Sequence, residues 1–130
     1  MPVVANQYNI VVEQGSTFTL SITYKDSEGD PIDLTNFTAR MDIRQTYTTE
    51  AALVELDSSD GGTGNTSGIA LGGLDGTITV VISSSATSGL TAPSTNVYDL
   101  ELRDTVGAIT RILEGKATVS PNATLSTYTG

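Results

Sequence analysis

The sequence predicts an all-β sandwich, and three observations lead to this prediction. Apolar and polar residues alternate with a period of two along several short segments, as they do in strands with one buried and one solvated face. Thr, Ser and Gly are abundant, whereas helix-forming runs are scarce. Turn-forming residues separate the alternating segments at steady intervals. The 130 residues suffice for one domain with a single modest core.

The clearest strand pattern is VYDLELR at residues 97–103. Its apolar side chains (Tyr98, Leu100, Leu102) share one face, and its charged side chains (Asp99, Glu101, Arg103) share the other. A short loop containing Gly107 follows, and then a second run over residues 109–119. These two segments predict a β-hairpin.

The N-terminal half supplies three further strand candidates: residues 8–12, expected at the edge of a sheet, residues 17–24 and residues 38–44. The side chains expected to face inward from the last two are Phe18, Leu20, Ile22, Tyr24, Ala39, Met41 and Ile43. Between these segments, Gly29 and Pro31 indicate a turn.

The elements between this half and the hairpin are shorter. Residues 53–56 and 69–71 predict brief strands, and residues 57–68, rich in Ser, Gly, Asp and Thr, predict an exposed loop. Residues 77–82 predict a strand with Ile78, Val80 and Ile82 facing inward. Residues 83–92 predict one helical turn, capped by Ser84 or Ser85 and stopped by Gly89.

Together these segments predict an immunoglobulin-like antiparallel β-sandwich of about seven strands, with a small barrel as the alternative. The chain has neither Cys nor Trp, so the disulfide-and-tryptophan core of antibody domains is absent. We expect the sandwich to span residues 8–121, with an N-terminal arm at residues 1–7 and a C-terminal tail at residues 122–130.

Composition argues against several classes of function. The absence of His and Cys removes the commonest metal ligand, the commonest general base and thiolate chemistry. A net charge of −9 argues against a nucleic-acid partner. No apolar run reaches the length of a membrane span, and residues 1–8 lack the pattern of a signal peptide. We therefore expect no enzyme, no cofactor, no small-molecule substrate and no catalytic or metal-binding residue.

Three groups of carboxylates could contradict this expectation. Asp26, Glu28, Asp30 and Asp33 could offer oxygens to calcium, but their spacing is not that of an EF-hand, and a solvated turn uses the same residues. A similar and weaker group lies in residues 57–62. Asp99 and Glu101 share one strand face as a glycosidase pair could, but nothing nearby indicates a cleft.

Five of the six basic residues lie on strands that we expect in one sheet: Arg40, Arg44, Arg103, Arg111 and Lys116. Lys25 lies elsewhere. One interpretation is cross-strand pairing with Asp42, Asp99, Glu101 and Glu114, each pair contributing about 0.2–1 kcal/mol. The other interpretation is a docking face. We favour pairing, because the carboxylates nearly balance the charge.

Three segments resemble a family of small tailed-bacteriophage virion proteins. They are IVVEQGSTFTLSITYKDSEGDPIDLTNFTARM at residues 10–41, FTARMDIR at residues 37–44 and VYDLELRDTVGAITRILEGKATVSP at residues 97–121. In these motifs the chain is similar to the immunoglobulin-like N-terminal domain of phage baseplate upper proteins. The resemblance implies a building block of the virion in the tail, baseplate or neck region, and it carries over no catalytic residue.

The resulting expectation is a non-enzymatic structural protein, present in the virion in multiple copies, that docks onto tail, baseplate or neck proteins. Alternatives are a capsid decoration protein and a carbohydrate-binding or adhesive module, for which Tyr47 and Tyr128 are the loosely placed aromatic residues. The residues expected at the interface are Thr124, Leu125, Thr127 and Tyr128 in the tail, and Arg40 and Arg44 on their strand.

Overall fold

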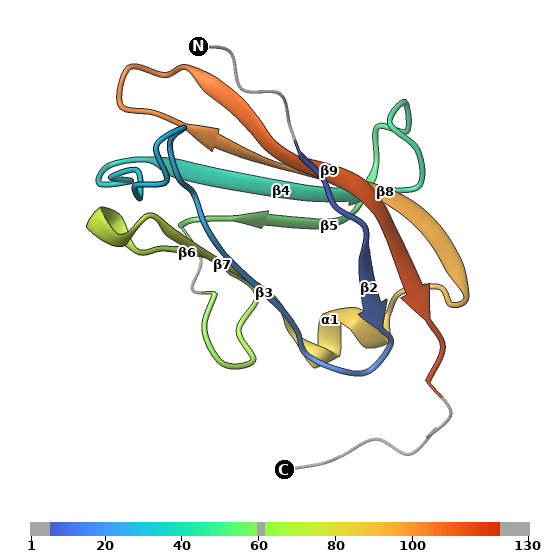
Figure 1. The fold of residues 1–130 in the computed structure, drawn as a ribbon. Helices are drawn as coiled ribbons and strands as arrows, with labels where there is room; N and C mark the ends of the chain where they lie inside the picture. The colour runs from blue at the N-terminus through green and yellow to red at the C-terminus, as the bar shows by residue number, and fades with distance from the viewer. Residues whose placement is uncertain (1–5, 60–61, 123–130) are drawn as a thin grey trace.

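The computed structural model describes residues 6–59 and 62–122, and two β-sheets pack face to face in it (Figure 1). The six-stranded sheet contains β1 (Asn6–Gln7), β2 (Ile10–Glu13), β9 (Ile109–Ser120), β8 (Ser94–Arg103), β4 (Thr38–Arg44) and β5 (Ala52–Asp57). The three-stranded sheet contains β3 (Phe18–Thr23), β7 (Thr77–Ile82) and β6 (Gly68–Leu71). The predicted all-β sandwich is confirmed.

The order of the strands is that of an immunoglobulin-like domain. The larger sheet runs β9-β8-β4-β5 and the smaller one β3-β7-β6, which corresponds to strands G, F, C and C′ facing strands B, E and D. The segments expected at residues 38–44 and 77–82 are β4 and β7 with the expected bounds. β8 begins at Ser94, earlier than expected, because the alternation that identifies it starts only at Val97.

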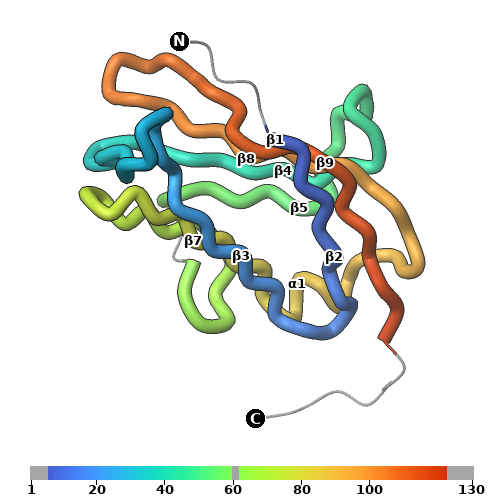
Figure 2. The backbone as a smooth tube through the Cα atoms, viewed as in Figure 1, coloured from blue at the N-terminus to red at the C-terminus, as the bar shows by residue number. Residues whose placement is uncertain are grey.

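The predicted antiparallel sandwich is present except at the N-terminus, where the larger sheet is mixed. β1 and β2 pair with β9 in parallel, so the blue N-terminal segment runs alongside β9 in Figure 2. Asn6 and Gln7, which lie before the strand expected from Tyr8, are also paired, although both are exposed. Their backbone pairs with Leu113 and Glu114, and a polar sequence gives no sign of such pairing.

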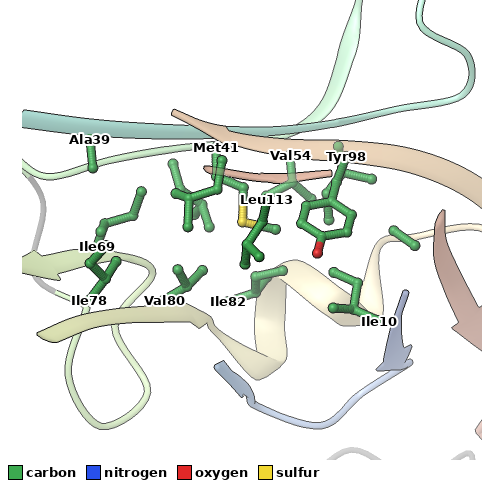
Figure 3. Packing of buried hydrophobic residues seen from close by; sticks show 14 of the residues in the cluster. Ile10, Ala39, Met41, Val54, Ile69, Ile78, Val80, Ile82, Tyr98 and Leu113 are labelled. Carbon is green, nitrogen blue, oxygen red and sulfur yellow. The ribbon is translucent and has the colours of Figure 1, made fainter. Parts of the chain in front are cut away.

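Most of the predicted core is buried between the sheets. Met41 and Tyr98 of the larger sheet point into the space between the sheets, and Ile78, Val80 and Ile82 of the smaller sheet enter it from the other side (Figure 3). Other predicted core residues that are buried are Ile43, Leu100 and Leu102. Phe18, Leu20 and Ile22 are only half-buried, which corrects the prediction that they lie in the core. The reason is that β3 is an edge strand of the smaller sheet, so one side of it is uncovered.

A β-bulge changes the inward-facing side of β9. Leu100 pairs with Leu113, but the next residue of β8, Glu101, pairs with Arg111. Ile112 is therefore the extra residue of the bulge, and both Ile112 and Leu113 are buried. The bulge lets Arg111 and Glu114 both face outward, although they are three residues apart.

The predicted helical turn is α1 (Ser84–Ser88), which connects β7 of the smaller sheet to β8 of the larger. Its N-cap is Ser83, whose hydroxyl accepts a hydrogen bond from Ala86 N, so the expected cap at Ser84 or Ser85 is wrong. Three consecutive serines make the cap ambiguous from sequence. The helix ends before Gly89, as expected.

Candidate functional site

The candidate site is the outer face of the larger sheet, where β4, β8 and β9 present charged side chains. We call it the charged face and define it by Arg40, Asp42, Arg44, Asp99, Glu101, Arg103, Arg111, Glu114 and Lys116. The alternation of each strand places these side chains away from the core. The expectation that five basic residues lie in one sheet is confirmed.

Two carboxylates lie directly opposite each other at the centre of the charged face. Asp42 of β4 pairs in register with Asp99 of β8. Arg44 Nη2 lies 2.7 Å from Asp42 Oδ2, and Arg111 Nε lies 3.3 Å from Asp99 Oδ2. Asp42 Oδ1 is buried and has no hydrogen-bond partner among the described residues. The sheet thus holds two carboxylates close together, each compensated by one arginine.

Burial and neighbouring charges both shift the pKa of Asp99. Desolvation is the largest effect and raises the pKa of Asp99, and Asp42 and Glu114 raise it further. Arg111 and Arg44 oppose this by lowering the pKa, but the net shift is upward. Arg111 also binds Glu114, with 3.1 Å between Nη1 and Oε1, and this hydrogen bond raises the pKa of the guanidinium. Arg111 therefore links two carboxylates of the charged face.

The two arginines that sequence reasoning assigned to an interface have different environments. Arg44 Nη1 donates to the carbonyls of Thr49 (2.9 Å) and Glu50, while Nη2 binds Asp42. Its guanidinium thus fastens the loop between β4 and β5. Arg40 is exposed and makes no ion pair within the described residues, although Glu101 lies opposite it in register.

Among the described residues, one ion pair provides the expected cross-strand charge pairing. Arg111 with Asp99 joins β9 to β8, whereas the pairs of Arg44 with Asp42 and of Arg111 with Glu114 lie within single strands. In the part of the chain that the structure describes, Arg40, Arg103 and Lys116 make no ion pair. Three cations of the charged face are therefore available to a partner.

Tyr47 adds an aromatic ring beside this face. It lies in the loop between β4 and β5, and 58% of its surface is exposed. Desolvation raises the pKa of Tyr47, and the negative charges of Glu114 and Asp99 raise it further. Sequence reasoning identified Tyr47 only as a loosely placed aromatic residue, because its position depends on the path of the loop.

An open groove of about 640 Å³ borders the charged face between β4, β5 and β6. Arg40 and Asp57 line its polar side, and Phe37, Ile69 and Leu71 line its apolar side. The hydroxyl of Ser58, which also lines the groove, accepts a hydrogen bond from Ala39 N (3.0 Å). The groove offers a mixed surface for contact, and sequence reasoning missed it because its walls come from three separate strands.

The acidic turn considered for calcium uses its oxygens for its own backbone. Asp26 Oδ1 accepts from the N–H groups of Glu28 (2.9 Å) and Asp30 (3.0 Å). Asp33 Oδ1 accepts from both the hydroxyl and the N–H of Thr35, and these bonds lower the pKa of Asp33. Across residues 6–59 and 62–122, no group of three or more Asp, Glu, His or Cys side chains is placed to hold a metal ion.

The remaining expected interface residues, Thr124, Leu125, Thr127 and Tyr128, lie outside the described residues. No helix in the described part of the chain is long and apolar enough to cross a membrane.

In comparisons with known proteins, no family model and no curated protein matches the chain. The fold and the charged face thus define an all-β sandwich with one broad, mixed-charge sheet surface.

Proposed function

We propose that the chain is a non-enzymatic structural component of a tailed-phage virion that docks onto tail, baseplate or neck proteins through the charged face. The observation that supports the docking site is that three cations make no ion pair with any described residue: Arg40, Arg103 and Lys116. The motifs at residues 10–41 and 97–121 resemble phage virion proteins, and this resemblance supports the proposal that the particle is a tailed-phage virion.

The partner that this face fits is a protein surface with carboxylates placed opposite the three cations. Such complementary charge steers association and fixes the orientation of two proteins more than it adds affinity. The nine residues that define the charged face include five cations and four carboxylates, so the net charge of −9 comes from the rest of the chain. The proposal assigns no catalysis to the protein, because neither His nor Cys is present to act as base or thiol nucleophile.

Charge-reversal variants in a phage that encodes the chain test this proposal. Arg40→Glu and Lys116→Glu alter the charged face, and Lys25→Glu is the matched control because it changes the net charge equally at a position off this face. We expect at least a tenfold loss of incorporation into purified particles for the two face variants and none for the control. Unchanged incorporation of both face variants, with normal melting, would refute docking through this face.

A carbohydrate-binding module is the second candidate, and Tyr47 favours it. An exposed aromatic ring in the loop that Arg44 of the charged face fastens can cover the apolar side of a sugar while charged groups bind its hydroxyls. In this case Tyr47→Ala would abolish binding to a glycan array. A capsid decoration protein would instead be distinguished by where the chain lies on the particle.

A further inference from the structure

One side of β3 has no strand beside it in the described part of the chain. β3 pairs only with β7, and Tyr24 N donates to Gly76 O at 2.8 Å just beyond the strand. In an antiparallel ladder, alternate residues point their N–H and C=O groups to the same side. Thr19, Ser21 and Thr23 therefore point theirs away from β7, and these groups have no hydrogen-bond partner among the described residues.

This edge lacks the features that normally prevent strands from pairing with another chain. Natural edge strands carry charges, proline or bulges, or they are very short. The β3 sequence FTLSIT contains no charge and no proline, and its six residues pair with β7 without a bulge. By contrast, the outer strand β5 carries Glu55 and Asp57, and β6 has four residues.

The side chains of β3 also remain incompletely covered. Phe18, Leu20 and Ile22 pack against the core but are only half-buried. A further strand beside β3 would cover them and would bond the free backbone groups at the same time. An added strand would therefore hydrogen-bond the backbone groups of this edge and bury its apolar side chains.

We propose that β3 pairs antiparallel with β3 of a second copy of this chain, about a two-fold axis at Ser21. In this register Ser21 lies opposite Ser21 of the second copy, and Thr19 lies opposite Thr23 of the second copy. Every outward N–H and C=O of the three residues is then bonded. Leu20 meets Ile22 of the second copy on the core side, and the two smaller sheets become one continuous sheet.

The edge favours a second copy as occupant because β3 is complementary to itself in this register. Long-range repulsion opposes the pairing, since each copy carries a net charge of −9. The strand itself is uncharged, and salt at about 0.15 M screens charges beyond roughly 8 Å. The pairing should therefore strengthen as salt increases. A single strand edge is a small interface, so the affinity is weak unless other particle contacts concentrate the copies.

Introduced cysteines test the pairing and its register, because the chain has no cysteine of its own. Cα atoms in a hydrogen-bonded antiparallel pair are about 5.5 Å apart, within disulfide range. We expect Ser21→Cys to form a disulfide-linked dimer on oxidation. Thr19→Cys should not, because the two copies of residue 19 would be roughly 13 Å apart. A mixture of Thr19→Cys and Thr23→Cys chains should cross-link to each other.

Sedimentation of the unlinked protein over a concentration series at high salt provides the second readout. Ser21→Pro removes an N–H that does not bond to β7, so the fold tolerates it while the pairing is lost. Ser21→Thr keeps the N–H and should associate like the original chain. The proposal is overturned by a monomer at every concentration, by dimers that persist in Ser21→Pro, or by Thr19→Cys linking as well as Ser21→Cys. Binding of an extended peptide from another virion protein to β3 in place of a second copy would also overturn it.

Discussion

The hydroxyl of Tyr98 donates a 2.6 Å hydrogen bond to the backbone carbonyl of Tyr8. Tyr98 lies opposite Gly115 of β9, and Tyr8 belongs to the segment between β1 and β2 that crosses Gly115. Asn9 Oδ1 accepts a hydrogen bond from Lys116 N at 3.0 Å, which replaces a backbone contact at the crossing. These contacts fasten the N-terminal strands to β9, so they lie in the larger sheet and leave the edge of β3 open.

The ionisation of Tyr98 should make the fold sensitive to alkaline pH. Desolvation by burial raises the pKa of Tyr98 to about 12, from an ordinary value of 10.0. The folded state therefore holds this proton more tightly than the unfolded state, and the stabilisation is fully present below pH 10 and is lost as pH rises toward 12. The full loss is about 3 kcal/mol. Urea unfolding between pH 9 and 12 should show this decline in the original protein and a smaller one in Tyr98→Phe; equal declines would contradict it.

Gly115→Ala should loosen the attachment of the N-terminal strands. A Cβ at this position would collide with the carbonyl of Tyr8 and lie 2.9 Å from Asn9 Oδ1, both in the crossing segment. We expect a loss of about 1–3 kcal/mol in unfolding free energy, together with faster amide exchange in β2. Gly89→Ala is the control, because its nearest neighbour, Ala86 O, is 3.7 Å away and its φ is −84°. Equal effects of the two substitutions would refute the crowding at Gly115.

Leucine truncations should distinguish the core from the open edge. Leu100 is fully buried, so Leu100→Ala should lower the unfolding free energy by about 2–5 kcal/mol. Leu20 on β3 is half-buried, so Leu20→Ala should cost clearly less under conditions where the chain is monomeric. Denaturant unfolding measures both values. A larger loss for Leu20 would mean that the edge of β3 is covered in the free protein.

Replacement of Asp99 by Asn should stabilise the sandwich at neutral pH. Desolvation raises the pKa of Asp99 above 3.8, so the folded state disfavours the charged form, and stability declines as pH rises through this pKa. The gain in stability from Asp99→Asn should be present at pH 7 and should shrink as pH falls toward 3.8. Glu101→Gln removes the same charge from the same face and serves as control. Thermal melting of both variants at several pH values measures this gain. An unchanged melting temperature of Asp99→Asn at pH 7 would contradict the prediction.

The sequence predicted the elements whose alternation is strict, and it failed where position depends on distant partners. β4, β7 and the core residues of β8 could be predicted because the alternation of apolar and polar residues within each strand is enough to show which side chains face the core. The half-burial of Phe18 and Leu20 could not, since edge position is a property of the sheet and is not visible in the strand. The opposition of Asp42 and Asp99 likewise depends on register between strands that are far apart in sequence. Arg40 and Arg44 look alike in the pattern, but only the loop carbonyls reveal that Arg44 is engaged.

A cryo-EM reconstruction of particles from a phage that encodes this chain tests the central claim most directly. The proposal predicts that the sandwich occupies the tail, baseplate or neck in multiple copies. It also predicts that Arg40, Arg103 and Lys116 are buried against carboxylates of a neighbouring protein. A chain that is absent from purified particles, or one that is bound with the charged face open to solvent, would contradict it.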